Sequence, residues 1–473
     1  MLFNSLHFFY FFILVTSIYY VLPHRYRWFL LLTASCYFYM VFKPVYILIL
    51  LATILIDYLA GIWIERSQGK QRRVWLILSL VANIGVLCFF KYYNFINDNI
   101  TAVLASVHTQ NPVPYLTMLL PIGLSFHTFQ AMSYTIEVYR GNQKAERHLG
   151  IYALYVMFYP QLVAGPIERP QNVLWQFHQK HPFQLSNLGA GLEMILWGLF
   201  KKVVLADRLA MLVNPVYNDP QHQPPLVLLI ATLAFALQIY FDFSGYSDIA
   251  LGTARTLGYS LMVNFRRPYL STSVAEFWTR WHISLSTWFR DYFYIPLGGN
   301  RVSVPRWYGN LLFTFLLSGL WHGPAWTYVI WGGLNGLYLI GENITRPITK
   351  HISLTIRQPL GWLLTICLIC VSWIFFRANS FSDATYILTH LLPVDRSEIA
   401  SLRGILSKYD LVVLVAGLLF IFLSEIIQEN PKLSRRFVPH SQPLRLASYY
   451  LLALFILLFG LFSVQEQFIY FQF

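Results

Sequence analysis

Residues 311–336, LLFTFLLSGLWHGPAWTYVIWGGLNG, decide the class of fold. Two apolar runs flank a Gly-Pro step, and the stretch contains no Asp, Glu, Lys or Arg. Mostly apolar runs that approach about 20 residues are long enough to cross the hydrocarbon core of a bilayer. The stretch therefore predicts two membrane helices, with a break just after His322 because proline interrupts a helix.

The composition of the whole chain indicates the same class. Of its 473 residues, 56% are apolar and only 12% are charged, which is about half the charged fraction of a soluble domain. Such a chain has too few polar residues to cover a water-exposed surface and too many apolar ones to remain disordered. We therefore predict an all-α polytopic membrane protein, with one integral-membrane domain over residues 1–473.

Thirteen apolar stretches are candidate spanning helices, of which we expect about eleven to be true spans because some are short or broken. They predict N-terminal spanning helices in residues 1–149, a core with re-entrant or interfacial segments in 150–345, and C-terminal spanning helices in 346–473. The candidate stretches are 3–22, 27–42, 44–63, 74–90, 115–136, 150–166, 187–206, 225–242, 309–327, 328–343, 358–376, 410–427 and 446–466.

The loops between the first helices indicate how the chain is oriented. The first loop (Arg25, Arg27), the third (residues 65–73) and the fifth (140–147) are basic, whereas the second and fourth are nearly neutral. Because basic loops stay in the cytoplasm, we expect the N-terminus on the extracytoplasmic side. The net charge of +13 lies in such loops and does not indicate a nucleic-acid surface. The alternation is lost after residue 150, which favours re-entrant segments there.

Polar side chains interrupt the apolar background of residues 232–342. Charged groups at membrane depth are costly, so they usually face a protein interior or a water-filled cavity. The first cluster, QIYFDFSGYSDIALG (238–252), contains Asp242 and Asp248. A helix that ends at the interface, with capping residues, and a polar wall of a reaction cavity explain this cluster equally well.

The second cluster is EFWTRWHISLSTWFRDYFYIPLGGNR (276–301). An interfacial helix with an aromatic belt would explain its aromatic and arginine residues, but that interpretation does not require His282. Arg280 and Arg290 are suited to pairing with phosphate or carboxylate groups.

The third cluster surrounds His322, which Trp321 precedes and Gly323-Pro324 follows. A structural histidine and a catalytic one explain the pattern about equally well. Neutral imidazole is a natural general base near pH 7, and the Trp321 N–H, Arg280 or freed backbone N–H groups are candidates for stabilising an oxyanion. The motifs of a nucleophile elbow, a P-loop and an H-E-x-x-H zinc site are absent from the sequence, and we predict no metal.

At these clusters the chain resembles the membrane-bound O-acyltransferase (MBOAT) family, and within it the AlgI-like branch named for alginate O-acetylation. The resembling motifs follow the family order along nearly the whole chain. They are MLFNS (1–5), LPIGLSFHTFQAMSYTIEVYRG (120–141), FYPQLVAGPIERP (158–170), GLFKKVVLADRLA (198–210), YFDFSGYSDIALG (240–252), FWTRWHISLSTWFRDYFYIPLGGNR (277–301), GLWHG (319–323) and WIFFRANSFSDA (373–384).

The resemblance implies a ring-like bundle of spanning helices around a thin centre pierced by a funnel or tunnel. It also implies that His322 is the catalytic histidine, as base or acyl relay, and that His282 is the second histidine of the site. No role is carried onto His127. Candidates for lining the donor tunnel or bracing its two halves are Arg280, Arg290, Asp291, Trp321, Asn335, Asp242 and Asp248.

The activity that the resemblance implies is transfer of an acetyl group across the bacterial inner membrane to an exported polysaccharide such as alginate. The donor is expected to be acetyl-CoA on the cytoplasmic side, with no bound cofactor. The acceptor is expected to be reached through a separate extracytoplasmic partner of the SGNH or AlgJ-like type.

Three alternatives remain open at the level of sequence. D-alanyl transfer to teichoic acid from a carrier protein, as in DltB-like relatives, is the nearest, although the segment 373–384 and the two candidate spans after it look more like the AlgI branch. A transporter or flippase without chemistry of its own also suits polar groups at membrane depth. A scaffold that recruits the true transferase would tolerate loss of both His282 and His322.

Overall fold

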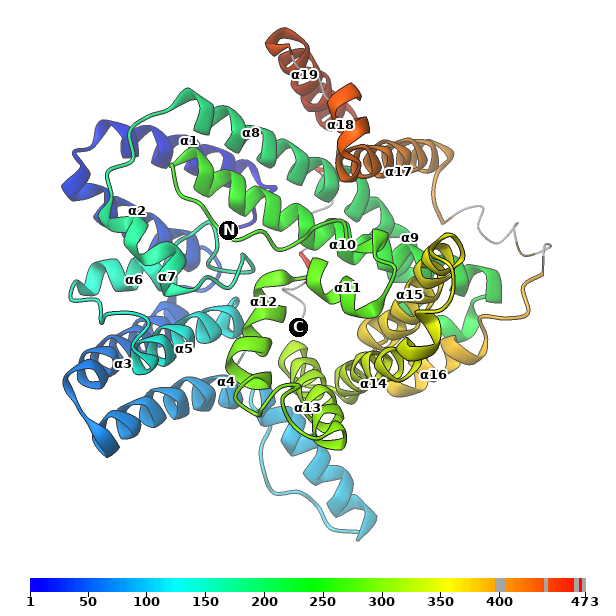
Figure 1. Ribbon diagram of the computed structural model, residues 1–473, viewed down its shortest axis with the longest axis horizontal. Coiled ribbons are helices and arrows are strands. Elements are labelled where there is room, and N and C mark those ends of the chain that lie inside the picture. Colours follow the sequence, from blue (N-terminus) through cyan, green and yellow to red (C-terminus); the bar gives the residue numbers. More distant parts are fainter. Residues whose placement is uncertain (119, 396–397, 399–404, 438–440, 463–467, 470–473) are drawn as a thin grey trace. The chain divides into compact units, whose positions relative to one another are not determined.

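A computed structural model describes the chain except for residues 119, 396–397, 399–404, 438–440, 463–467 and 470–473. Throughout the described residues the regular structure is helical, without a β-strand (Figure 1). The chain divides into two compact units, one made of residues 1–195 with 249–262 and the other of residues 196–248 with 263–473. The predicted division at residues 149 and 345 stays a prediction.

The first unit is a set of apolar helices whose ends coincide with local signals. The Ser5 hydroxyl accepts a hydrogen bond from the Phe8 N–H and so caps α1. Gly141, in the left-handed region with φ +81°, ends α5. The helices are α1 (Leu6–Val21), α2 (His24–Met40), η1 (Pro44–Tyr46), α3 (Ile47–Arg66), α4 (Gly69–Ser106), α5 (Leu124–Arg140), α6 (Leu149–Met157), α7 (Pro170–Val173), η2 (Leu174–His178) and most of α8 (Leu185–Leu199).

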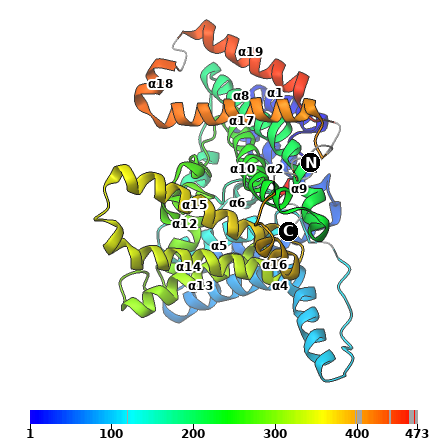
Figure 2. The ribbon, with the colours of Figure 1, turned by 90° about the vertical axis from the view of Figure 1, so that its right-hand side faces the viewer.

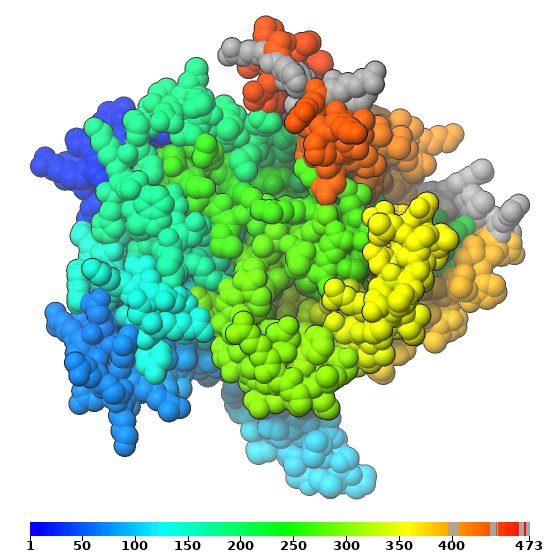
Figure 3. All heavy atoms as spheres, in the orientation of Figure 1, coloured from blue at the N-terminus to red at the C-terminus, as the bar shows by residue number. Residues whose placement is uncertain are grey.

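Helix α4 is the longest element of this unit. Its 38 residues rise about 57 Å, well beyond the roughly 30 Å of a hydrocarbon core. Its first half packs on α3 and α5. Its distal half and the loop that follows, residues 107–118, project away from them, as the light-blue segment of Figures 2 and 3 shows. Asn94 holds this loop by exchanging hydrogen bonds of 2.9 Å with the backbone of Leu116.

The second unit contains the helices around the predicted histidines. Among them, α11 and α12 have 7 residues each and the π-helix η6 has 5, which is too short to cross a bilayer. The elements of this unit are η3 (Phe200–Ala206), α9 (Asp207–Asn218), η4 (Pro220–His222), α10 (Pro225–Thr256), η5 (Pro268–Leu270), α11 (Val274–Arg280), α12 (Ile283–Phe289), η6 (Arg290–Tyr294), α13 (Val304–His322), α14 (Trp326–Thr349), α15 (Leu354–Arg377), α16 (Phe381–Thr389), α17 (Lys408–Glu429), α18 (Pro431–Phe437) and α19 (Gln442–Phe459). The last residues of α8 also belong here, and α10 leaves this unit after residue 248.

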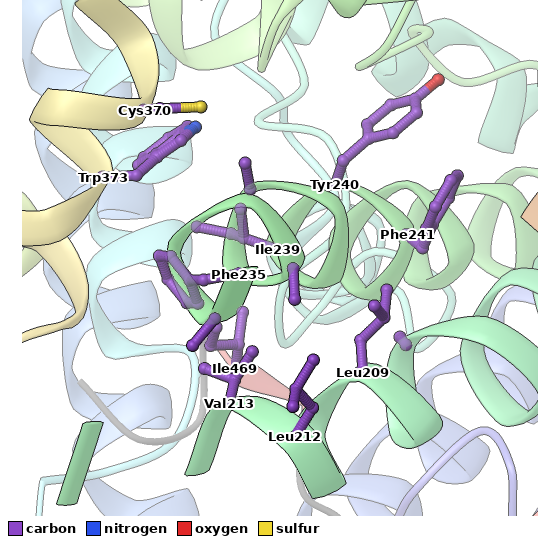
Figure 4. Packing of buried hydrophobic residues seen from close by; sticks show 14 of the residues in the cluster. Leu209, Leu212, Val213, Phe235, Ile239, Tyr240, Phe241, Cys370, Trp373 and Ile469 are labelled. Carbon is purple, nitrogen blue, oxygen red and sulfur yellow. The ribbon is translucent and has the colours of Figure 1, made fainter. Parts of the chain in front are cut away.

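A continuous apolar core holds the second unit together. Side chains of η3, α9, α10 and α15 meet in it, and Figure 4 shows Phe235 and Ile239 of α10 facing Val213 of α9 and Trp373 of α15. Between membrane helices such side chains stabilise the fold by van der Waals packing rather than by removal from water. The core thereby gives the polar residues of α10 defined positions.

The helices agree in part with the predicted spans. Among the described residues, five helices are long and apolar enough to cross a membrane: Pro44–Arg66, Gly69–Ser106, Pro225–Thr256, Leu354–Arg377 and Lys408–Glu429. The total number of spans and the central funnel stay predictions, and residues 119 and 463–466 of two candidate stretches lie outside the described part of the chain.

Two candidate spans are wrong as single spanning helices. In residues 115–136, α5 begins only at Leu124, and the described residues before it are not helical. In residues 150–166, α6 ends at Met157 and the backbone continues in turns. A nine-residue helix rises only about 14 Å. The cause is local, because Pro160 and Pro166 cannot continue the helical hydrogen-bond ladder.

Candidate active site

Helices α13 and α14 form a tight hairpin that carries His322. Residue His322 is the last of α13, and the predicted break follows it because Gly323 is extended and Pro324 cannot propagate the helix. A Cβ atom on Gly319 would overlap the carbonyl oxygen of Tyr328, and one on Gly332 would overlap that of Phe315. Only glycine allows the two backbones to approach so closely, and the helices lie side by side in Figures 1 and 2.

The hairpin places His322 in a box of aromatic rings. Its side chain is only 5% exposed. The imidazole centroid lies 4.9 Å from the rings of Trp321 and Trp331 and 5.4 Å from the ring of Phe376, all nearly edge-on. The box therefore combines α13, α14 and α15, and it excludes bulk water from the imidazole on the sides that these rings cover.

His282 occupies the turn between α11 and α12 in an uncommon backbone conformation. Its φ of +43° lies in the left-handed region, where non-glycine residues are rare although histidine is enriched among them. The Asn264 side chain accepts a hydrogen bond from the Ser284 N–H at 3.2 Å, and its backbone carbonyl accepts one from the Ile283 N–H at 3.0 Å. These bonds fix the turn and thus the direction of the imidazole.

The two histidines meet at one indole. The His282 ring lies 6.4 Å from that of Trp321, which in turn contacts His322 at 4.9 Å. On its other side His282 meets the ring of Phe243 at 4.7 Å. His282 is 1% exposed, and burial lowers the pKa of its imidazole to about 3, so it is neutral at pH 7. A neutral imidazole can accept a proton, which is the chemistry of a general base.

A cavity of about 440 Å³ is lined by side chains of α11, α12, η6, α13 and α14. Neither histidine is among the lining residues, but Ile283, which follows His282, is one of them. Ser318, one helical turn before His322 on α13, lines it, and so does Trp278, whose ring is 5.7 Å from that of Trp331. Arg290 supplies a positive charge to the lining. A mostly apolar cavity of this size with a few polar groups suits a small-molecule substrate.

The structure distinguishes the two predicted tunnel arginines. Arg280 is held away from the cavity by ion pairs with Glu276 at 2.7 Å and with Glu429, at the end of α17, at 2.9 Å. Arg290 pairs with the adjacent Asp291 at 2.7 Å and remains half-exposed at the cavity lining. Arg280 therefore braces α11 against α17, and Arg290 is the one of the two that lines the cavity.

The remaining predicted residues lie on α10 and α14. Asp242 and Asp248 form ion pairs of 2.7 Å with Lys202 and Lys201. Asn335 is fully buried and donates a hydrogen bond of 2.8 Å to the Trp331 carbonyl, so it steadies the turn of α14 that touches His322. The structure thus gathers His282, His322 and Trp321 in one place, and it gives Asp242 and Asp248 other partners.

Sequence reasoning overlooked several residues that shape the site. Phe243 lies inside a cluster already marked as polar, and its aromatic contact had no local signal. Asn264 lies in a loop without a motif. Lys202 did carry a signal, because two adjacent lysines interrupt the apolar run GLFKKVV (198–204), and a buried charge inside an apolar run marks a structural or functional partner.

Helices of membrane-spanning length with buried histidines beside a cavity define a multi-pass membrane protein with a candidate active site. A family model described as MBOAT, membrane-bound O-acyltransferase family, matches residues 147–382. A probable alginate O-acetylase, AlgI, of Azotobacter vinelandii is 41% identical over 392 residues, covering 81% of this chain and 76% of that protein.

Two further relatives differ in how much of the chain they match. A peptidoglycan O-acetyltransferase of Helicobacter pylori is 34% identical over 406 residues, covering 80% of this chain and 76% of its own length. A teichoic acid D-alanyltransferase of Streptococcus thermophilus is 31% identical over 232 residues, covering 46% of this chain and 56% of its own length.

The chain belongs to the membrane-bound O-acyltransferase family. The family predicted from the ordered motifs is thereby confirmed, and the protein is an acyltransferase of the membrane.

Proposed function

We propose that this protein transfers acetyl groups from a cytoplasmic donor, acetyl-CoA, across the bacterial inner membrane for O-acetylation of an exported polysaccharide such as alginate. The relatives that match four-fifths of the chain are named for alginate and peptidoglycan O-acetylation. Two relatives named for teichoic acid D-alanyl transfer match less of the chain, 46% in Streptococcus thermophilus and 58% in Bacillus subtilis. The difference in coverage favours acetyl over D-alanyl as the group that is moved.

One observation carries the proposed chemistry. A buried histidine, His322, ends α13 inside an aromatic box, one turn from Ser318 in the wall of the cavity. We place the thioester in the cavity with its acyl end at Ser318, so that the acyl carbon extends along α13 toward the imidazole. Because the surrounding rings keep water away, hydrolysis of the thioester would be suppressed relative to transfer.

The proposed transfer needs the imidazole of His322, the acceptor hydroxyl and the thioester. His322 accepts the proton of an acceptor hydroxyl while the hydroxyl oxygen attacks the acetyl carbonyl carbon. A carbon–oxygen bond forms, the carbon–sulfur bond breaks, and the thiolate of CoA leaves and receives the proton. The indole N–H of Trp321, between the two imidazoles, is the candidate donor for the developing oxyanion. His282 assists by orienting the acceptor or sharing its proton.

The polar rim of the cavity would serve the donor. Arg290 carries a guanidinium that matches the phosphate groups of CoA, and Asp291 would keep it oriented when no ligand is bound. Arg280 and Asn335 would act at a distance by holding α11 and α14. We place the N-terminus on the extracytoplasmic side and expect a separate extracytoplasmic partner of the SGNH or AlgJ-like type to receive the acetyl group.

Purified protein with radiolabelled acetyl-CoA tests this proposal. CoA release or acetyl binding by the wild type should be lost in His322→Ala and retained in His351→Ala, a matched variant at an exposed histidine of the same unit. Turnover by a folded His322→Ala variant equal to that of the wild type would exclude the mechanism.

The D-alanyl alternative has a different donor. If well-folded wild type does not react with acetyl-CoA but accepts a D-alanyl group from its carrier protein, the protein is a teichoic acid D-alanyltransferase and the acetyl proposal is wrong. If O-acetylation in cells survives the loss of both His282 and His322 at equal expression, a scaffold replaces it. Movement of a glycan or ion without any acyl transfer would instead favour a transporter.

A further inference from the structure

A buried ion cluster lies in η3 and the adjoining helices of the second unit. The Lys202 side chain is 1% exposed, and its Nζ lies 2.7 Å from Asp242 Oδ1 and 2.9 Å from Asp207 Oδ1. Removing charges from water costs several kcal/mol per ion unless partners and hydrogen bonds compensate. Stability alone does not explain such a cluster, because apolar residues of the same volume often stabilise a protein equally well.

Asp242 uses its second oxygen to hold a distant segment. Its Oδ2 accepts a hydrogen bond of 2.6 Å from the backbone N–H of Ile469, which is 227 residues away in the sequence. One carboxylate therefore joins Lys202 on η3 to the segment Phe468–Ile469. A charge-assisted bond to a backbone N–H is among the stronger hydrogen bonds in proteins.

Further contacts press the same segment against the unit. The Lys202 ammonium lies 4.4 Å from the centroid of the Phe468 ring, a cation–π geometry. The Phe468 ring meets that of Tyr246 edge-on at 4.8 Å. Ile469 is buried in the apolar core, where Figure 4 shows it beside Val213. Both residues of the segment are nearly inaccessible, with exposures of 2% and 4%.

The π-helical form of η3 brings both of its lysines to α10. Lys201 pairs with Asp248 and Lys202 with Asp242, while Gly245 lies so close to the neighbouring backbone that an added Cβ would be 2.8 Å from the Gly198 carbonyl oxygen. π-Helical turns are rare and frequently occur at functional sites. Only one of the two ion pairs touches the segment Phe468–Ile469, which gives the chain a built-in control.

One turn of α10 lies between this segment and the candidate active site. Tyr246, which contacts Phe468, lies three residues after Phe243, so their side chains share a face of the helix. The Phe243 ring is the one that meets His282 at 4.7 Å. One turn of α10 therefore carries both the ring that contacts Phe468 and the ring that contacts His282.

We propose that Phe468–Ile469 is an internal strap of the active site, fastened by Lys202 and Asp242, and that the strap keeps Phe243 against His282. Lys202 and Asp242 are then positioning residues. This inference deepens the proposed acyl transfer and rests on it for its kinetic consequence, but the strap itself has a structural readout that needs no turnover.

The structural readout is the accessibility of residue 469. Ile469→Cys, in a chain whose four native cysteines are alanine, keeps the backbone N–H and places a thiol where the residue is 4% exposed, so a thiol reagent should label it slowly. Adding Lys202→Met should raise the labelling rate several-fold. Adding Lys201→Met should leave the rate unchanged, because the ion pair of Lys201 is with Asp248 and not with Asp242.

The kinetic readout is the acetyl-CoA assay. Lys202→Met and Ile469→Pro should lower kcat by about 10- to 100-fold, the size of effect that a small misplacement of reacting groups produces. KM for the donor should stay unchanged, because the cavity wall does not include the strap. Lys201→Met should keep kcat within about twofold, since its ion pair is partly exposed.

Two results would overturn the strap. One is a labelling rate of Ile469→Cys that does not change when Lys202→Met is added. The other is an equal loss of kcat in Lys201→Met and Lys202→Met at equal melting temperature, because the effect would then not depend on contact with the strap. If labelling depends on Lys202 while His322→Ala still turns over acetyl-CoA, the strap stands and the proposed chemistry fails.

Discussion

His322 and His282 meet at the same indole, but different forces hold them there. His322 ends a long helix, and its position follows from helix packing, with glycines at the crossing and rings on three helices around it. His282 lies in a turn with φ +43°, held by backbone N–H groups that donate hydrogen bonds to Asn264 and by the ring of Phe243. Packing tolerates no added volume, whereas a hydrogen-bonded turn tolerates volume but not the loss of a polar partner.

The largest effect is expected where packing holds a histidine. Gly332→Ala adds one Cβ that overlaps the Phe315 carbonyl, and overpacking of this kind costs about 1–3 kcal/mol or more. We expect a clear fall in melting temperature and loss of acyl transfer in detergent-purified protein. The adjacent Gly333→Ala is the control, because its Cβ would meet only Leu316 at 3.4 Å. Equal melting temperatures for the two variants would refute the packing argument.

The next effect separates backbone conformation from chemistry at His282. Asparagine tolerates the left-handed region, whereas a β-branched residue does not. His282→Asn should fold with a melting temperature close to that of the wild type and lose acyl transfer by about 10²-fold, the usual contribution of a proton-transfer group. His282→Val should lose both. Full activity of a folded His282→Asn variant would show that the imidazole has no part in the reaction.

Relaxing the turn should have a smaller effect than removing its histidine. Asn264→Ala deletes the acceptor of the Ser284 N–H, at a cost of about 1–3 kcal/mol for the buried donor left behind. We expect kcat to fall more than melting temperature. Asn310→Ala is the control, since Asn310 is also buried and bonds the carbonyls of Leu297 and Gly299 away from His282. A fall in kcat as large for Asn310→Ala would contradict a specific role of the turn.

The smallest effect is expected at the arginine that braces α11. Arg280→Gln breaks partly exposed ion pairs with Glu276 and Glu429, which are worth about 0–1 kcal/mol. Its KM for acetyl-CoA should stay within twofold of the wild type, whereas Arg290→Gln, at the cavity, should raise KM several-fold. The reverse order in a steady-state assay would mean that the donor approaches along Arg280.

Prediction from the sequence succeeded for local features. The Gly323-Pro324 break and the membrane class appear in the structure or in the family assignment, because helix breaking and apolar run length depend on neighbours in the chain. The catalytic roles of His282 and His322 stay predictions. It failed for residues 150–166, where prolines outweighed an apolar run. It could not distinguish Arg280 from Arg290, because the partner that withdraws Arg280, Glu429, is 149 residues away.

By itself, the sequence determined that this protein crosses a membrane, where its helices break near His322, and to which acyltransferase family it belongs. Only the tertiary structure decided that His282 and His322 share the ring of Trp321, and that Asp242 binds Lys202 together with the backbone of Ile469. The reason is physical. Run length and helix breaks are properties of consecutive residues, whereas contacts between distant residues arise only when packing brings their helices together.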